Sequence, residues 1–114
     1  NAKESKEIIF TRGTTESINL LATALLPWIQ AGDEIIISGM EHHSNLVPWQ
    51  QLCEKNKARL KVLPVDLDGT LDLNFLEKML TPQVKLLAVT HISNVLGTVN
   101  PVKEIVELAH EKGV

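Results

Sequence analysis

Apolar residues recur at helical spacing in four segments of the chain, and this pattern predicts four helices that each bury one face. The first helix opens at residues 13–16 and is closed by Pro27 and then Gly32. The second follows a polar loop and ends at about Asn56, with Pro48 in its first turn, where proline is tolerated. Both segments are amphipathic, so each should cover one face of a larger core.

The other two helices begin at residues that favour a helix start. Asp72 can cap a short third helix, because its side-chain oxygen can accept from the free N–H groups of the first turn. Asn100 is the expected N-cap of the fourth helix, and Pro101 is its expected first residue. The predicted buried face of this helix carries Val102, Ile105, Val106 and Ala109, and the predicted solvated face carries Lys103, Glu104, Glu107 and Glu111.

Four further segments have the composition of β-strands. Residues 34–38 form a β-branched run of the kind that is buried on both faces of a parallel sheet. Residues 59–65 alternate between outward and inward positions, and residues 66–70 after them contain the turn signal Asp-Gly. Residues 7–11 and 85–90 are the other two expected strands.

Strand and helix thus alternate four times along the chain. Such alternation with short connections predicts an α/β fold, with a mostly parallel sheet and helices on both of its faces. Ligands of open α/β sheets bind at the carboxyl ends of the strands, where three polar loops are expected here. These loops, residues 12–16, 38–45 and 91–98, are therefore the expected location of a functional site.

Composition narrows the class of protein. The chain has 114 residues, 44% hydrophobic and 22% charged, as in a soluble globular protein. It has no apolar run near the roughly 18 residues of a membrane-spanning helix, and a net charge of -3 without a basic cluster predicts no nucleic-acid surface. Its one cysteine, Cys53, reads as a small core residue and favours the reducing cytoplasm. The ends at Asn1 and Val114 look cut, so we expect a piece of a longer protein.

The first loop has the chemistry of a phosphate site. Gly13, Thr14 and Thr15 lie where an expected strand leads into a helix. Backbone N–H groups, two hydroxyls and the positive end of the helix dipole would meet there. An ordinary helix start with Thr14 as the N-cap explains the same residues, and the segment has neither P-loop nor dinucleotide-binding spacing.

Histidine and asparagine side chains follow two other expected strands. His42 and His43 can stack on a flat cofactor, transfer protons, bind a metal, or simply be polar surface residues. A metal site would need His91 or carboxylates as further ligands, and because no zinc spacing is present we expect no metal. Asn94 can donate its amide to a phenolate or carbonyl oxygen of a ligand, or can form a turn.

Three segments, read together, resemble the group II cysteine desulfurases. They are residues 10–19 (FTRGTTESIN), 39–50 (GMEHHSNLVPWQ) and 90–98 (THISNVLGT), in this order and at this spacing. These desulfurases are pyridoxal 5'-phosphate (PLP) enzymes of the class V aminotransferase family. The resemblance covers nearly the whole chain, and it implies that residues 1–114 are part of the large PLP domain of fold type I, without the rest of that domain or the small C-terminal domain.

The resemblance also implies roles for four residues. Thr14 and Thr15 would hold the cofactor phosphate, and Asn94 would hydrogen-bond the phenolic oxygen of the cofactor. His42 would stack on the pyridine ring and serve proton transfers, which makes it the candidate catalytic residue. No role is implied for His43.

The resemblance implies a homodimeric parent enzyme that converts L-cysteine to L-alanine and an enzyme-bound persulfide. The sulfur would then pass to an acceptor protein for iron–sulfur cluster assembly. The Schiff-base lysine and the nucleophilic cysteine of the family belong to segments outside this chain, so we expect no catalysis from this piece alone. Three alternatives remain open: another class V enzyme (selenocysteine lyase, kynureninase or aminotransferase), a non-catalytic binding module, and a metal hydrolase that uses His42, His43 and His91.

Overall fold

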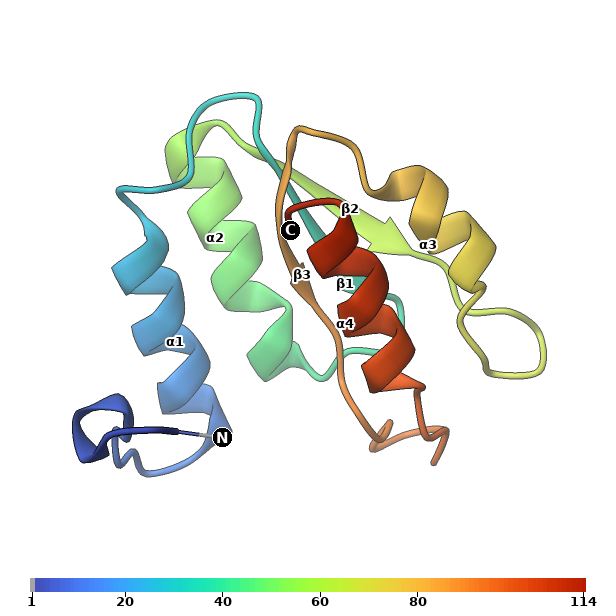
Figure 1. The fold of residues 1–114 in the computed structure, drawn as a ribbon, viewed down its shortest axis with the longest axis horizontal. Coiled ribbons are helices and arrows are strands. Elements are labelled where there is room, and N and C mark those ends of the chain that lie inside the picture. The colour runs from blue at the N-terminus through green and yellow to red at the C-terminus, as the bar shows by residue number, and fades with distance from the viewer. Residues whose placement is uncertain (1) are drawn as a thin grey trace.

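The computed structural model describes residues 2–114, so Asn1 lies outside the described residues. Three strands form one parallel sheet, in which β1 (Glu34–Ser38) lies between β2 (Arg59–Leu63) and β3 (Val84–Ala88). The sheet is accompanied by two 3-10 turns and four α-helices within this range (Figure 1). These elements are η1 (Ser5–Glu7), α1 (Thr14–Leu25), η2 (His43–Asn45), α2 (Val47–Asn56), α3 (Leu73–Met79) and α4 (Val102–Glu111).

The central strand β1 is buried along its whole length, because it has a strand on each side and helices on both faces. Ile35 pairs with Leu60 of β2 and with Leu86 of β3. Ile35 and Ile37 point to one face of the sheet and Ile36 to the other, and all three are 0% exposed. Full burial of each isoleucine side chain contributes roughly 1.5–3 kcal/mol, so this run of three anchors the fold.

Each face of the sheet carries its own pair of helices and its own core. On one face α1 and α2 lie side by side, and Ala22 of α1 and Trp49 of α2 belong to the same core cluster as Ile35 (Figure 1). On the other face, Leu76 of α3 and Ile105 of α4 pack against the opposite side of β1. The prediction of a mostly parallel α/β sheet with helices on both faces is confirmed.

The predicted cap of α3 and the predicted turn before it are both confirmed. Asp72 Oδ1 accepts the N–H groups of Asn74 at 2.8 Å and Phe75 at 3.2 Å, so Asp72 is the N-cap. In the turn before it, the Gly69 N–H donates to the Asp66 carbonyl at 2.9 Å. Gly69 has a φ of +83°, a conformation that glycine adopts without steric cost.

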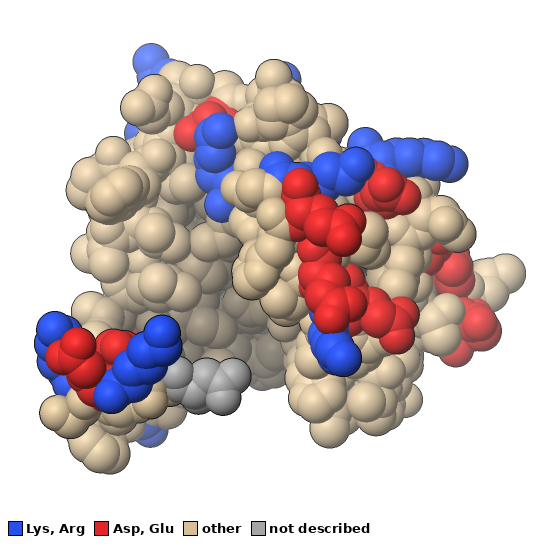
Figure 2. Space-filling view, viewed as in Figure 1, with Lys and Arg blue, Asp and Glu red and all other residues tan. Residues whose placement is uncertain are grey.

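The outer face of α4 is solvated and acidic, as predicted. Glu104, Glu107 and Glu111 are exposed, and Figure 2 shows acidic side chains gathered over this helix. Lys103 Nζ lies 4.0 Å from Glu107 Oε1, and these side chains are 88% and 61% exposed. An exposed pair of this kind contributes little to stability, so the face serves solvation.

The first expected strand, residues 7–11, is not formed. Residues 5–7 form η1, and Ile8, Ile9 and Phe10 are 53%, 70% and 94% exposed. β-branched residues favour an extended backbone, but a strand also needs a hydrogen-bonding partner, and residues 7–11 pair with no strand in the described chain. Strand and helix therefore alternate three times. The strand β1 has the predicted bounds, β2 ends two residues earlier than predicted, and β3 begins one residue and ends two residues earlier than predicted.

The start of α4 also differs from the prediction. The helix begins at Val102, and Pro101 precedes it as an N-cap without a side-chain hydrogen bond. Asn100 is 2% exposed, and its Nδ2 donates to the Thr90 carbonyl at 2.8 Å. A buried amide needs such a partner, so Asn100 closes the loop after β3 instead of capping the helix. Val106, predicted to be buried, is 45% exposed, because it lies beside the edge strand β3. The rest of the predicted buried face is buried or half-buried: Val102, Ile105 and Ala109.

Candidate functional site

The three polar loops meet at the carboxyl edge of the sheet and line one pocket of about 720 Å³. The start of α1 contributes Thr14 and Thr15, the loop after β1 contributes His42, and the loop after β3 contributes Asn94. The structure therefore brings the four sequence-predicted site residues together from three separate loops. The remaining lining residues are Arg12, Gly13, Glu16, Asn19, Ser44, Thr90 and Ile92.

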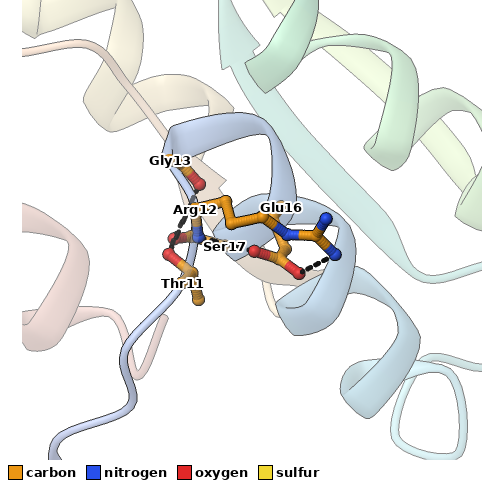
Figure 3. A network of polar contacts seen from close by, with 5 residues as sticks. All are labelled: Thr11, Arg12, Gly13, Glu16 and Ser17. Atoms are coloured by element: carbon orange, nitrogen blue, oxygen red, sulfur yellow. Dashed lines mark hydrogen bonds and ion pairs between the residues drawn. The ribbon is translucent and has the colours of Figure 1, made fainter.

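The N-terminus of α1 is fixed by polar contacts around Gly13 (Figure 3). Gly13 is the N-cap, and its φ of +155° is a conformation that L side chains rarely adopt. The Thr11 and Ser17 hydroxyls lie 2.7 Å apart, and Ser17 Oγ donates to the Gly13 carbonyl at 3.2 Å. The Arg12 N–H donates to Glu16 Oε2 at 2.6 Å. These contacts define the turn and leave the first N–H groups of α1 without intrahelical partners, as at every helix start.

This end of the pocket has the chemistry of an anion site. Gly13 and not Thr14 is the N-cap, so the alternative of Thr14 as an N-cap is wrong. The hydroxyls of Thr14 and Thr15 are exposed and line the pocket beside the positive end of the helix dipole. Arg12 Nη2 lies 3.5 Å from Glu16 Oε1, with side chains 93% and 44% exposed. Because exposed pairs are weak, the Arg12 guanidinium can turn to an anion at small cost.

The His42 ring is oriented by the turn that it begins. His42 is the N-cap of η2, and its Nδ1 accepts the Ser44 N–H at 3.1 Å and lies 2.9 Å from Ser44 Oγ. A backbone N–H can only donate, so Nδ1 carries the lone pair and the ring proton of the neutral form is on Nε2. The exposed ring lines the pocket, with its Nδ1 toward Ser44.

Asn94 lies in the loop after β3, next to Ser93, whose hydrogen bonds hold this loop together. The Ser93 side chain is 2% exposed, and its Oγ accepts the Leu96 N–H at 3.1 Å. The Ser93 backbone also forms two hydrogen bonds across the loop. Its N–H donates to the Thr98 carbonyl at 2.9 Å, and its carbonyl accepts the Gly97 N–H at 3.0 Å. The turn-forming role that the sequence allowed for this segment therefore belongs to Ser93, and Asn94 remains exposed at the pocket.

Sequence reasoning missed three polar residues of the pocket. Asn19 lies one helical turn after Thr15 and donates its Nδ2 to the Thr15 carbonyl at 2.8 Å. Ser44 orients His42, and Thr90 follows β3 directly at the sheet edge. The i, i+4 spacing of Asn19 from Thr15 was a usable signal. The role of Ser44 depends on a local turn, which a single sequence does not reveal.

Other chemically reactive residues lie outside this pocket. His43 lines a neighbouring surface cavity, and in residues 2–114 no group of three or more His, Cys, Asp or Glu side chains could hold a metal ion. Cys53 is 4% exposed inside α2, and burial raises the pKa of its thiol, with a smaller contribution from the Glu54 carboxylate. Cys53 belongs to the core cluster that contains Trp49 and Leu52, which confirms it as a core residue. Within residues 2–114, none of the helices combines the length and hydrophobicity needed to span a bilayer.

Comparison with known proteins identifies the family. Residues 1–114 match the family model "Aminotransferase class-V" over their whole length. The chain belongs to the class-V aminotransferase family. Among curated class-V relatives, the cysteine desulfurase of Enterobacter sp. (strain 638) is 51% identical over 99% of this chain and 28% of its own length.

Solved structures of two cysteine desulfurases share the fold. The cysteine desulfurase CsdA from Escherichia coli superposes with a TM-score of 0.93 and 39% identity, over 99% of this chain and 29% of CsdA. The apo cysteine desulfurase from Thermococcus onnurineus NA1 superposes with a TM-score of 0.92 and 40% sequence identity, over 97% of this chain and 28% of that protein. The chain thus spans less than a third of the length of these relatives, and the predicted resemblance and fold are confirmed.

Proposed function

We propose that this chain is the cofactor-binding part of a PLP-dependent cysteine desulfurase. The observation that carries this proposal is the pocket at the sheet edge, where Thr14, Thr15, His42 and Asn94 converge. Membership of the class-V family and the likeness to proteins named cysteine desulfurase support it. Residues 1–114 then belong to the large PLP domain of the whole protein.

The α1 end of the pocket fits the phosphate group of PLP. A phosphate needs several hydrogen-bond donors and a positive potential, and the free N–H groups at the helix start supply both. The hydroxyls of Thr14 and Thr15 add two further donors, and Arg12 lines the same pocket. The backbone needs no rearrangement, because contacts around Gly13 already hold this turn.

The opposite side of the pocket fits the ring of PLP. When bound, PLP supplies an electron sink for the negative charge that develops on the substrate during the reaction. His42 would stack on the pyridine ring of bound PLP, and its Nε2 would hold or give a proton. Asn94 would donate its side-chain amide to the phenolic oxygen of the cofactor. Both residues line the pocket from loops that hydrogen bonds hold in place.

The proposed reaction belongs to the whole protein. L-cysteine is converted to L-alanine, and its sulfur atom is left on a cysteine of the enzyme as a persulfide. A sulfur-acceptor protein then takes the sulfur for iron–sulfur cluster assembly. We propose a cytoplasmic homodimer, with no nucleic-acid or membrane partner. The buried thiol of Cys53 cannot be the sulfur carrier, so that cysteine lies elsewhere in the protein.

The proposal is tested with the full-length protein loaded with PLP. Incubation with L-cysteine should release one molecule of L-alanine for each sulfur atom that is transferred to a thiol acceptor. A chelator should leave the rate unchanged. Formation of 3-mercaptopyruvate by amino-group transfer from L-cysteine to an added keto acid, or cleavage of kynurenine in preference to L-cysteine, would assign another class-V activity. Selenide release from L-selenocysteine with no turnover of L-cysteine would identify a selenocysteine lyase, and absence of PLP binding would leave only the binding module.

A further inference from the structure

The carboxylate of Glu41 joins three parts of the fold at the edge of the pocket. Glu41 is half-buried and directly precedes His42. Its Oε1 accepts hydrogen bonds from the Ser38 hydroxyl at the end of β1 and from the Thr90 N–H after β3, the latter at 2.7 Å. Its Oε2 accepts from Asn45 Nδ2 in η2 at 2.7 Å. One side chain therefore connects the ends of two neighbouring strands to the turn that carries His42.

This junction is anchored in the hydrophobic core through Asn45. Asn45 Oδ1 accepts the indole N–H of Trp49 at 2.9 Å, and Trp49 is 2% exposed in the core between α2 and the sheet. Because the Asn45 oxygen is used by Trp49, its amide nitrogen must face Glu41. The amide cannot turn around without facing the indole N–H with its own N–H groups. The contacts of Glu41 are thus determined from both sides.

We infer that Glu41 is a positioning residue, which sets where the His42 ring stands in the pocket. The inference rests on the proposed function, in which His42 contacts the cofactor ring. Ser44 orients the His42 ring through a hydrogen bond to Nδ1. Glu41 is the residue before His42, and its side-chain hydrogen bonds hold this part of the backbone against the ends of both strands. Thr90, a second lining residue, is held by the same carboxylate. Catalytic contact is made by His42, and Glu41 acts through it.

Glu41→Gln tests this inference, because an amide of the same shape cannot satisfy the same partners. If the Gln oxygen takes the place of Oε1, its NH2 group faces the NH2 group of Asn45. If the Gln oxygen takes the place of Oε2, its NH2 group faces the Thr90 N–H. In either orientation two donors oppose each other, so the junction loosens while the volume of the side chain is kept. Glu41→Asp is the second variant, since it keeps the charge but is one methylene too short to span the junction.

The same strand offers a matched control. Glu34, at the opposite end of β1, is also an inward-facing carboxylate, with Arg59 Nη2 and Lys61 Nζ each at 2.8 Å. Glu34→Gln removes the ion pairs of this buried carboxylate with two partly exposed cations, at the end of β1 away from the pocket. We expect it to lower the Tm of the protein and to leave the affinity for PLP unchanged within about twofold. A general loss of stability is thereby separated from a local change at His42.

The measurement is a double-mutant cycle on the dissociation constant of PLP, followed by cofactor absorbance in the full-length protein. We expect Glu41→Gln to weaken PLP binding roughly tenfold in the wild-type background, the equivalent of one lost hydrogen bond to a charged group. In a His42→Ala background the same change should alter binding by less than about twofold, because the residue through which Glu41 acts is gone. If Glu41→Gln does not fold, Glu41→Asp goes through the same cycle.

The possible results separate the inference from the proposed function. A loss of PLP affinity that is seen in the wild-type background and not in the His42→Ala background supports positioning through His42. An unchanged affinity, or an equal loss in the His42→Ala background, overturns the inference while the proposed function stands. A wild-type protein that does not bind PLP overturns both, and this result is obtained before any variant is made.

Discussion

Thr14→Ala removes one hydroxyl from the start of α1 and is the most informative single perturbation of the pocket. Thr14 is the first residue of the helix, it is exposed, and it lines the pocket beside the free N–H groups. In our account its hydroxyl donates to the cofactor phosphate. The substitution leaves the helix intact, because alanine has the highest helix propensity and Gly13, not Thr14, is the N-cap.

The expected magnitude follows from the charge of the acceptor. A hydrogen bond to a charged group contributes about 1.5–3 kcal/mol, so its loss should raise the dissociation constant of PLP roughly tenfold to a hundredfold. The gain in helix propensity from Thr to Ala is about 0.5 kcal/mol, so the Tm of the apo protein should not fall. Thr23→Ala is the matched control, since Thr23 lies in the same helix and its hydroxyl donates to the Asn19 carbonyl at 2.8 Å.

The assay compares PLP with pyridoxal, which lacks the phosphate, in titrations of the apo form of the full-length protein. Thr14→Ala should weaken binding of PLP and leave binding of pyridoxal unchanged, and Thr23→Ala should change neither. An equal loss for both ligands would show that the substitution disturbs the ring side of the pocket. Unchanged PLP affinity would refute the assignment of the phosphate to the start of α1.

Three further predictions concern the site and the fold. His42→Ala should reduce the rate of alanine release more than His43→Ala, because only His42 lines the main pocket; equal losses, measured at saturating L-cysteine, would refute the stacking assignment. Asp72→Ala should destabilise the protein by about 1 kcal/mol in urea unfolding, because two N–H groups of α3 lose their acceptor; a change below about 0.3 kcal/mol would contradict the cap. The hydrogen bond from Lys61, followed by the charges of Lys61 and Arg59, lowers the pKa of Glu34 despite its burial. Its carboxylate therefore stabilises the fold above the unfolded-state pKa of about 4.3, and this stability is lost as the pH falls through the lowered pKa. Glu34→Gln should make the Tm fall less steeply as the pH is lowered through the acidic range. An unchanged fall of the Tm would contradict the ion pair.

The sequence predicted those parts of the fold whose signals are local. The Ile35–Ile37 run has the composition of a doubly covered strand, and it is the centre of the sheet. Asp72 caps α3 with its own side chain, so neighbouring residues were sufficient to predict it. Residues 7–11 have strand composition but no partner strand, and partners are a property of the whole fold. Asn100 was misassigned because its buried side chain donates to the Thr90 carbonyl across the loop after β3, and this contact depends on how the loop folds back.

The location of the site was predictable to the same extent. Three loops after expected strands or before an expected helix were enough to place Thr14, Thr15, His42 and Asn94 at one edge. The role of Glu41 was not visible, because its Thr90 partner lies 49 residues away along the chain. Contacts of this kind depend on strand order, which alternation alone does not determine.

The most direct test of the account is a crystal structure of the full-length protein loaded with PLP. We expect the phosphate within hydrogen-bond distance of the Thr14 and Thr15 hydroxyls and of the first N–H groups of α1, the pyridine ring stacked on His42, and the phenolic oxygen next to the Asn94 amide. PLP bound with its phosphate away from the start of α1, or with its ring away from His42, would contradict the account.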